Sequence, residues 1–401
     1  MKSLIITLLA LLPPLFAQGG TTVVVDSLTN EPIAGATLFS SSGRVAATTD
    51  FEGRMPRVAA ALYPLTVKCL GFSDKVIAAP GDSIIRLSDR SVELPEVVVK
   101  SQKNNVLHIL ALVREHSTLA TYTDTVTMFR EKWVDFMVPG RKASGFKGWM
   151  TPRILSSRSY YRFTNDSGLD SVSDRFNQHF SWTDWVGVID RIPIPESMAG
   201  PDAPTLTLYG KYSPTEVWNR RGDDITLSVD ALADTASRRW LPNMSDFFRH
   251  NLDFERLRIN YSFCDVAVDT LYARDLAGIS FNIESRGRGR SMFRFNKPDE
   301  PFFVTTYAEI FMVDKEYIKP SEARKWENLA FPRALLDSMP MPEEVPERLP
   351  AVLALMERVD AIDHYERRSR LQPDWRMGNL SLQPLTFSQR LLKFMKGMVG
   401  M

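Results

Sequence analysis

The sequence predicts a mainly β protein with accessory helices, an α+β fold. Short runs of β-branched residues alternate with turn signals between Thr21 and Val99, which is typical of a small β-sandwich. Longer runs of the same kind recur from Thr125 to Val313 and indicate a larger antiparallel β-rich domain. Apolar residues at helical spacing lie at the start of this second region and again after Pro320.

A chain of 401 residues is long enough for two or three domains. We divide it into a leader, a β-sandwich, a β-rich domain opened by a helix, and a C-terminal helical segment, which cover residues 1–17, 18–100, 101–320 and 321–401. Lys and Arg total 49 against 48 Asp and Glu. With charges so balanced, no net electrostatic field favours nucleic acid as a partner.

Residues 1–17, MKSLIITLLALLPPLFA, predict a secretory signal peptide. Lys2 supplies the positive charge, Leu4 to Leu12 form a short apolar segment, and Ala17 is a small residue at the cleavage position. A membrane anchor is the alternative, but the apolar run is shorter than the ~20 residues that span a bilayer. We therefore expect the protein to be exported.

The chain has two cysteines, Cys69 and Cys264, too few for a disulfide framework. Cys69 lies on the same alternating face as Leu65 and Val67. This position predicts a buried free thiol, with a disulfide to Cys264 as the alternative.

Seven strands are expected in the first domain, at Thr21–Val25, Gly35–Ser40, Val45–Thr49, Leu62–Leu70, Lys75–Ala79, Ile84–Leu87 and Glu96–Val99. The stretch Asp50–Gly53 has the Asp and Gly of a tight turn. Seven strands in so short a segment leave no room for parallel crossovers, which need a dozen or more residues each. A Greek-key sandwich is the economical arrangement.

Four motifs of this domain, VVVDSLTNEPIAGATLF, TTDFEGR, LTVKCLGFSDKVI and IIRLSDRSVELPEVVV, resemble the carboxypeptidase-regulatory-like domain. That family is a transthyretin-like sandwich found at the N-terminus of cell-envelope proteins of Bacteroidota. Met55 and Pro64 depart from its pattern. The resemblance implies an accessory domain without catalytic residues, in a protein of the periplasm or the outer membrane.

A zinc carboxypeptidase is not expected, because none of the five histidines has Glu three residues further on. The segment LPEVVVKSQ resembles the join between this domain and the plug of TonB-dependent receptors. The roughly 300 residues that follow lack the repeated amphipathic ten-residue strands of such a transporter.

A helix is predicted from Asn105 to His116, because Val106, Ile109 and Val113 recur at helical spacing together with Leu110. Strands are then predicted at Thr125–Met137, Phe146–Met150, Ser157–Thr164, Thr205–Tyr212, Ile225–Val229, Leu257–Val268, Gly278–Glu284, Ser291–Phe295 and Phe302–Val313. The last four form a meander with turns at Asp269–Asp275 and Arg286–Arg290. Its pattern is similar to the half-barrel sheets of periplasmic lipoprotein-carrier-like domains, which offer an apolar concave face.

Three helices are predicted after Pro320, at Ser321–Leu329, from Pro350 to about Arg368, and over residues 387–398. The second carries a stripe of Val352, Leu355, Met356 and Val359. The last is amphipathic and basic, which suits either an anionic membrane surface or packing on the protein itself.

The candidate site residues are few, and no catalytic residue is assigned. Ser144 and Lys147 match Ser-x-x-Lys, but the companion motifs of that enzyme class are absent. Trp182 and Trp185 are candidate ligand-binding residues, with core packing as the alternative. The candidates for contact with a membrane or partner are Arg286, Arg288, Arg290, Phe387, Arg390, Leu391, Lys393, Phe394 and Lys396.

The sequence therefore favours a non-catalytic cell-envelope protein that binds an envelope protein, a lipid or a glycan through its β-rich domain, with peripheral membrane contact. No metal, cofactor or nucleic acid is expected. A hydrolase of unrecognised type is the first alternative, which a His–Asp pair or convergent carboxylates in a cleft would favour. A structural spacer without an apolar cleft is the second.

Overall fold

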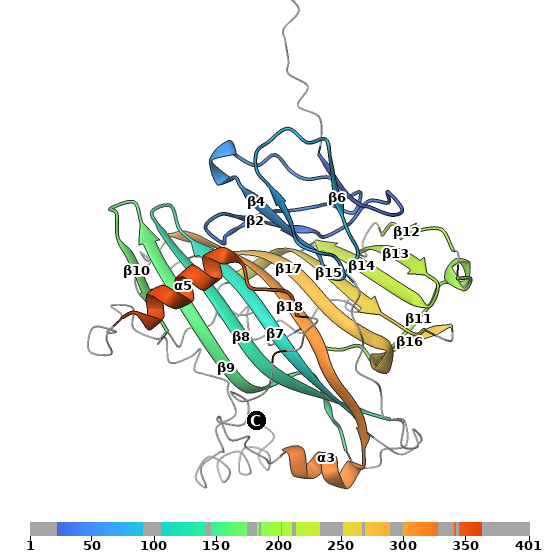
Figure 1. Ribbon diagram of the computed structural model, residues 1–401. Coiled ribbons are helices and arrows are strands. Elements are labelled where there is room, and N and C mark those ends of the chain that lie inside the picture. Colours follow the sequence, from blue (N-terminus) through green and yellow to red (C-terminus); the bar gives the residue numbers. More distant parts are fainter. Residues whose placement is uncertain are drawn as a thin grey trace, which may run out of the picture.

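The computed structural model describes residues 22–90, 106–140, 146–174, 183, 186–201, 203–210, 214–232, 252–266, 269–288, 300–327, 341 and 345–362. Within them the protein is mainly β, with two α-helices and a large antiparallel sheet (Figure 1). A smaller N-terminal unit, residues 22–90, sits against one face of that sheet. None of the helices in the described part of the chain is long and apolar enough to cross a membrane.

The N-terminal unit contains two small sheets. Strands β1 (Val23–Asp26) and β6 (Ile84–Leu87) form a parallel pair. The expectation that this segment has no room for a parallel crossover is therefore wrong, because the whole stretch between β1 and β6 serves as the connection. The other sheet runs β3-β2-β4-β5, and its strands are Val45–Thr48, Thr37–Ser40, Leu65–Lys68 and Lys75–Ile77. A shared apolar core includes Val24, Leu38 and Cys69. Six of the seven expected strands are thus present, and the seventh, Glu96–Val99, lies outside the described residues.

The large sheet has ten strands in the order β10-β9-β8-β7-β18-β17-β15-β14-β13-β12. All neighbouring strands in it are antiparallel. In chain order their bounds are Val106–Ala120 (β7), Asp124–Pro139 (β8), Trp149–Asn165 (β9), Asp170–Ser173 (β10), Leu206–Leu208 (β12), Thr215–Arg221 (β13), Asp224–Leu232 (β14), Leu252–Phe263 (β15), Leu276–Arg288 (β17) and Pro301–Ile318 (β18).

One face of the large sheet carries the main apolar core. Alternate residues such as Ile109, Leu227 and Ile310 point into it. A separate two-stranded sheet, β11 (Arg191–Pro193) with β16 (Thr270–Tyr272), adds Ile192 and Leu271 to this core. The opposite face is covered by the N-terminal unit and by a helix, so the central strands are buried on both sides.

The helix predicted from Asn105 to His116 is wrong, because these residues belong to strand β7. Ile109 and Val113 point into the main core, whereas Leu112 packs in a different cluster on the other face. A strand buried on both faces is apolar almost throughout, and periodicity cannot distinguish it from a buried helix. The domain therefore opens with a central strand.

Other strand predictions differ in extent. The strand expected at Ser157–Thr164 lies within the single strand β9, and the one expected at Phe146–Met150 overlaps β9 only at its end. β10, β11, β13 and β16 were not predicted, and β16 lies within the turn expected at Asp269–Asp275, so that prediction is wrong. β15 begins at Leu252, five residues before the expected start. The turn expected at Arg286–Arg290 is wrong in its first half. Arg286 and Arg288 belong to strand β17, where they pair with residues of β18. The strand expected at Ser291–Phe295 lies outside the described residues.

The two α-helices begin close to where the sequence predicts them. α3 spans Pro320–Glu327, and α5 spans Pro350–Asp360 with proline in its first turn. α5 ends well before Arg368 and lies against β9 and β10. Its stripe of Val352, Leu355 and Val359 is buried. The helix expected over residues 387–398 lies outside the described residues.

The N-terminal unit is anchored to the large sheet by Phe39. This side chain is fully buried and packs with Phe129, Tyr160 and Tyr307 of the sheet. The ring of His116 on β7 lies 5.0 Å from that of Phe39. An aromatic cluster thus joins segments far apart in the sequence.

His116 makes this junction sensitive to acid. Burial, together with the charges of Lys68 and Arg114, lowers the pKa of His116 from 6.5 to about 3. Below pH 6.5 the unfolded chain therefore binds a proton at His116, whereas the folded protein does not. Neutral His116 costs the folded state nothing above pH 6.5, and the free energy of unfolding decreases as the pH falls from 6.5 toward 3. At pH 4 we expect a loss of about 3 kcal/mol.

The measurement is urea denaturation of the wild type and of His116→Phe from pH 7 to pH 4. The variant keeps an aromatic ring in the cluster but has no ionisable group. Between pH 7 and pH 4 we expect the free energy of unfolding of His116→Phe to fall by about 3 kcal/mol less than that of the wild type. Parallel pH curves for the two proteins would contradict the account.

Candidate functional site

A cavity of about 500 Å³ lies between the N-terminal unit and the large sheet. Strands β13, β14 and β15 provide one wall, and the ends of β1, β4 and β6 provide the other. In Figure 1 the strands β13, β14 and β15 lie directly under the N-terminal unit. A cavity of this size at a junction between two parts of a protein is a typical place for a small ligand.

The sheet wall of the cavity carries small neutral polar side chains. Thr226 and Ser228 of β14 line it together with Asn260 and Ser262 of β15. They alternate with residues that point into the main core, such as Leu227. The two faces of these strands thus differ in chemistry, with one face apolar and the other supplying hydroxyl and amide groups.

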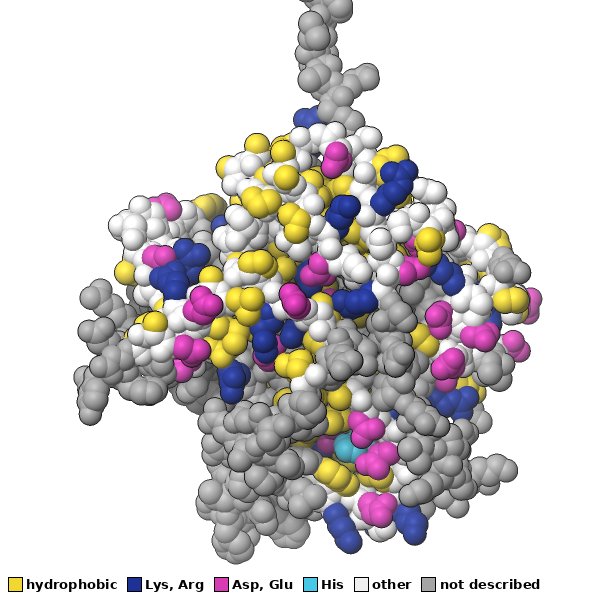
Figure 2. Space-filling view, in the orientation of Figure 1, with side chains coloured by type: hydrophobic (Ala, Val, Ile, Leu, Met, Phe, Trp, Pro, Cys, Tyr) yellow, Lys and Arg dark blue, Asp and Glu magenta, His cyan; other side chains and the backbone are white. Residues whose placement is uncertain are grey.

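Charged residues at the rim tie the two parts of the molecule together. The guanidinium of Arg221 on β13 forms ion pairs with Asp26 and Asp89 of the N-terminal unit, the latter with Nη1 2.7 Å from Oδ2. Burial lowers the pKa of Arg221 and raises the pKa of Asp89. Among the residues coloured in Figure 2, positive and negative side chains both occur over this face.

Glu31 makes the second tie across the cavity. Its Oε1 accepts a hydrogen bond from Thr205 Oγ1 at 2.6 Å, and its Oε2 accepts one from Asn219 Nδ2 at 2.7 Å. Both carboxylate oxygens are therefore satisfied by donors on the large-sheet side. Such cross-links hold the wall of the N-terminal unit at a fixed distance from the sheet.

The loop after β1 approaches the sheet closely at Gly35. Its φ is +71°, and a Cβ atom there would lie 2.7 Å from Asn260 Nδ2. Gly71 lines the cavity itself and has a φ of +85°, but no atom lies within 4 Å of its would-be Cβ. The two glycines have similar backbones and different surroundings.

This contrast gives a matched pair of variants. Gly35→Ala and Gly71→Ala both force alanine into a left-handed backbone, at about 1–2 kcal/mol each. Gly35→Ala also pushes the loop away from Asn260, which we expect to cost about 1 kcal/mol more. Chemical denaturation of both variants measures the difference. Equal losses would mean that the loop is not seated on the sheet.

Both cysteines of the chain line the cavity, and both are free thiols. Burial raises the pKa of Cys69 to about 12, with the charge of Glu309 adding to the effect. Burial and the neighbouring Asp224 raise the pKa of Cys264 to about 12 as well. Such thiols are protonated at neutral pH and are poor nucleophiles.

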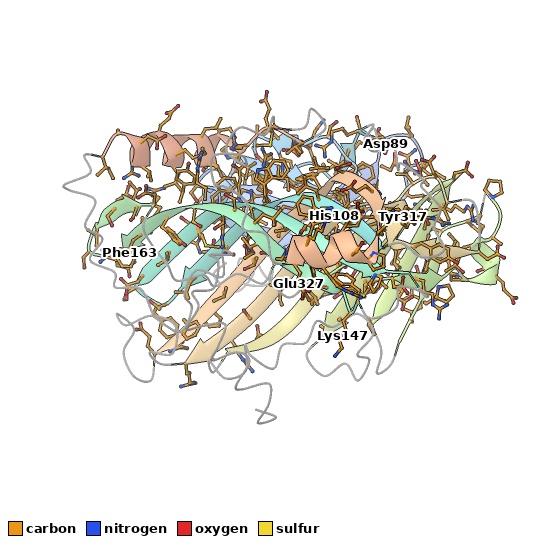
Figure 3. The ribbon with its side chains drawn as sticks, turned by 90° about the horizontal axis from the view of Figure 1, so that it is seen from below. Asp89, His108, Lys147, Phe163, Tyr317 and Glu327 are labelled. Atoms are coloured by element: carbon orange, nitrogen blue, oxygen red, sulfur yellow. The ribbon has the colours of Figure 1, made fainter. Side chains whose placement is uncertain are left out.

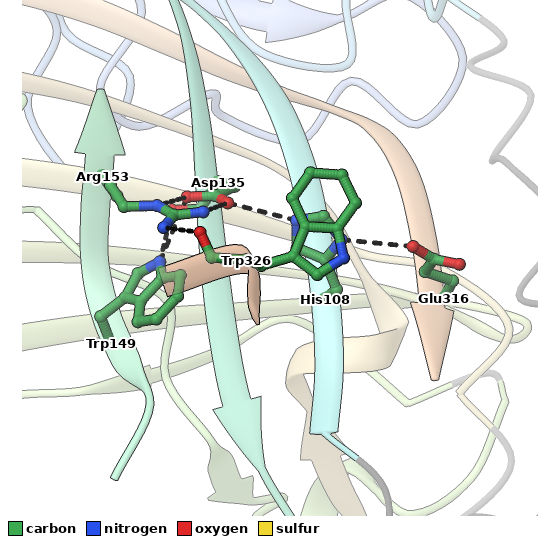
Figure 4. Close-up of polar contacts among 6 residues, drawn as sticks. All are labelled: His108, Asp135, Trp149, Arg153, Glu316 and Trp326. Carbon is green, nitrogen blue, oxygen red and sulfur yellow. Dashed lines mark hydrogen bonds and ion pairs between the residues drawn. The ribbon is translucent and has the colours of Figure 1, made fainter. Parts of the chain in front are cut away.

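A second polar cluster surrounds Asp135 at the other end of the sheet. Asp135 is fully buried, and its Oδ1 accepts hydrogen bonds from Arg153 Nε at 2.8 Å and Trp149 Nε1 at 3.2 Å. His108 Nε2 lies 3.3 Å from Oδ2, and His108 Nδ1 lies 3.4 Å from Glu316 Oε1. Figure 4 shows Arg153 and His108 on either side of Asp135, with Glu316 beyond His108.

This cluster holds α3 against the sheet. Arg153 Nη1 donates to the carbonyl of Trp326 at 2.6 Å, in the last turn of α3. The Trp326 ring lies 5.0 Å from that of His108. From below, Figure 3 shows His108 beside this helix and Asp89 in a different part of the molecule. The cluster and the cavity are therefore separate sites.

The charge state of Asp135 follows from its partners. Burial acts to raise its pKa, but hydrogen bonds from His108 and Arg153 outweigh burial and hold the pKa below the ordinary value. Both ring nitrogens of His108 face carboxylates. A general base needs a ring nitrogen directed at its substrate, so this His–Asp pair is arranged for structure.

A third cluster lies on the apolar face of the sheet. Glu115 of β7 and Lys132 of β8 form an ion pair, with Nζ 3.3 Å from Oε2, and both are fully or almost fully buried. Thr183 donates to the same carboxylate at 3.0 Å. Removing one partner of such a pair would leave an uncompensated buried charge, which is strongly destabilising.

The candidates predicted from the sequence do not converge on the cavity. Arg286 and Arg288 are exposed on β17, and Arg286 pairs with Glu255 at 3.1 Å, far along the strand from the cavity residue Ser262. Lys147 precedes β9, whereas Ser144 lies outside the described residues. The remaining candidates also lie outside the described residues, namely Trp182, Trp185, Arg290, Phe387, Arg390, Leu391, Lys393, Phe394 and Lys396.

Sequence reasoning missed the residues of the cavity, although part of the signal was present. The segment DITLSVDAL alternates apolar and polar residues, which separates Leu227 from Thr226 and Ser228. That pattern predicts two different faces. It carries no information that the N-terminal unit covers the polar one.

No protein-family model matches the chain, and comparison with curated proteins gives no match. Among solved structures, the chain is similar to one titled "Lipid-protein interactions in lipovitellin", with a TM-score of 0.27 and 9% sequence identity. The similarity covers 54% of this chain and 26% of that chain. Likeness at this level identifies neither a family nor a function.

Proposed function

We propose that the protein is a non-catalytic, exported cell-envelope protein that binds a small polar molecule in the cavity between the N-terminal unit and the large sheet. The observation that carries the proposal is the cavity of about 500 Å³, lined by hydroxyl and amide side chains. Ligand sites typically have volumes of about 300–1,000 Å³ and a few convergent polar groups. The binding role thus belongs to the β-rich part of the chain together with its N-terminal cover.

Export and an envelope location are supported by the sequence of residues 1–17 and by the resemblance of residues 21–99 to the carboxypeptidase-regulatory-like domain. The two small sheets around one core are compatible with a transthyretin-like sandwich. Arg286 and Arg288 are the described part of the proposed contact with a membrane or partner. Cell fractionation with and without residues 1–17 tests export, and equal fractions in the cytoplasm would contradict it.

The non-catalytic part of the proposal is supported by the cluster around Asp135. In a hydrolase that uses a His–Asp pair, the second ring nitrogen of the histidine is directed at the substrate. In His108 that nitrogen faces Glu316 at 3.4 Å, and Trp326 packs on the ring. The cluster therefore fits a role in holding α3.

Filling the cavity tests the binding site. Thr226→Trp places a large ring on the exposed side of β14 in the cavity, and Thr151→Trp places the same ring on an exposed position of β9 outside it. We would measure thermal shifts with sugars, amino acids, short peptides and polyamines. A ligand at 100 times its Kd stabilises the folded state by about 2.7 kcal/mol.

We expect at least one class of compound to raise the melting temperature of the wild type and of Thr151→Trp, but not of Thr226→Trp. Equal responses of all three proteins would place the site elsewhere. No response to any class would reject the proposed function.

A further inference from the structure

The charges that line the cavity are largely used within the protein. Four carboxylates and two guanidinium groups line it, namely Asp26, Glu31, Asp89, Asp224, Arg90 and Arg221. As described above, Arg221 pairs with two of these carboxylates, and Glu31 is satisfied at both oxygens. Three of the four carboxylates and one of the two guanidinium groups are therefore engaged within the protein, which leaves one charge of each sign, Asp224 and Arg90, without an ion pair among the described residues.

The groups that stay available are neutral. Thr226, Ser228 and Ser262 have no side-chain hydrogen-bond partner among the described residues, and all three line the cavity. Asn260 donates from Nδ2 to Ser280 Oγ at 3.4 Å, and within the described part of the chain its carbonyl oxygen accepts no hydrogen bond. Each hydroxyl can both donate and accept.

Strand pairing arranges these four groups as a two-by-two array. Thr226 lies directly opposite Ser262, and Ser228 lies directly opposite Asn260. Opposite side chains in an antiparallel pair are about 5 Å apart, and alternate residues along a strand are about 7 Å apart. The array is therefore a flat patch of donors and acceptors held by the backbone ladder, with little freedom to rearrange.

We propose that the occupant of the cavity is a neutral, hydroxyl-rich molecule, of the class of a mono- or oligosaccharide. This inference rests on the proposed function of the cavity as a binding site. Sugar hydroxyls offer donors and acceptors in the same mixture as the array, so each partner satisfies the other. An ionic ligand would lose its hydration, and for a counter-charge it would find among the described residues only Asp224 or Arg90, the two charged lining residues left over by the ion pairs of Arg221 and the hydrogen bonds of Glu31.

Two lining residues complete the pocket. Phe72 is half-buried and adds an aromatic side chain to the lining of the cavity. Arg90 has a buried Nε without a partner among the described residues, which is the one feature that favours an anion. The lining carries four acidic groups against two basic ones, so an anion meets net repulsion there.

The test compares matched saccharides by isothermal titration calorimetry. The probes are neutral di- and trisaccharides of glucose, galactose, mannose and N-acetylglucosamine, each beside its uronate and its free-amine counterpart. The protein variants are Thr226→Val, which removes one hydroxyl from the array with little change of shape, and Thr151→Val as the control outside the cavity. Thr226→Trp serves as the filled cavity.

We expect at least one neutral saccharide to bind, at least tenfold more tightly than its charged counterparts. Thr226→Val should weaken that binding about fivefold, and Thr151→Val should leave it unchanged. Tighter binding of a uronate or an amine that is lost in Thr226→Trp would overturn the neutral class while the cavity stays the binding site. If no saccharide binds, the inference is rejected, and the thermal-shift panel of peptides, amino acids and polyamines decides separately on the proposed function.

Discussion

Replacing Phe39 by alanine is expected to lower the free energy of unfolding by about 3–5 kcal/mol and to uncouple the N-terminal unit from the large sheet. Phe39 is fully buried, and its ring lies 5.2 Å from that of Tyr307 and 5.0 Å from that of His116. It is the large apolar side chain of the unit that enters the aromatic cluster of the sheet. Its loss leaves a cavity at the junction, not inside either part.

Urea denaturation followed by two probes distinguishes uncoupling from a general loss of stability. All eight tryptophans lie after residue 130, outside the N-terminal unit, so their fluorescence reports on the rest of the chain, whereas far-ultraviolet circular dichroism reports on the whole chain. We expect one coincident transition for the wild type and two separated transitions for Phe39→Ala. Leu28→Ala, at a side chain that is 73% exposed, is the control and should change stability by less than about 0.5 kcal/mol.

Removing the carboxylate of Asp135 is the second change with a large expected effect. Asp135→Ala leaves the guanidinium of Arg153 in a site where its side chain is only 11% exposed and has lost its counter-charge. Breaking a buried ion pair in this way costs about 3–5 kcal/mol. Because Arg153 also donates to the Trp326 carbonyl, we expect the packing of α3 to loosen in the same variant.

The double variant Asp135→Ala/Arg153→Met identifies the cause. If the loss comes from an uncompensated buried charge, removing that charge should recover part of the stability. Asp170→Ala breaks the exposed pairs with Arg162 and Arg358 and should cost about 1 kcal/mol or less. A loss for Asp135→Ala as small as that of Asp170→Ala would contradict the structural role of the cluster.

The sequence predicts the fold class well where strands have one polar face. The alternation in DITLSVDAL gives β14, and the short runs of residues 22–90 give six strands there. It fails at β7, where the apolar residues point to two different cores, and at β13, where Trp218 is its single fully buried residue among seven. In both cases the environment that decides the structure comes from distant parts of the chain.

The candidate site is less accessible to sequence reasoning for the same reason. Thr226 and Ser262 are ordinary strand residues 36 positions apart, and they become one array only through the register of β14 with β15. The cavity also needs the loop at Gly35, which reaches the sheet from the N-terminal unit. Tryptophan pairs and arginine runs are more conspicuous in the sequence, but those among the described residues lie away from the cavity.

The protection of Cys264 from alkylation tests most directly whether ligand binds in the cavity. Cys264 lines the cavity and is partly exposed, so in a Cys69→Ala background it is a single native reporter of occupancy. Its raised pKa makes the reaction slow, and mildly alkaline conditions make the rate measurable. With the compound that gives the largest thermal shift, we expect alkylation to slow in proportion to the occupied fraction. Saturating ligand that leaves the rate unchanged would contradict the assignment of the cavity as the binding site.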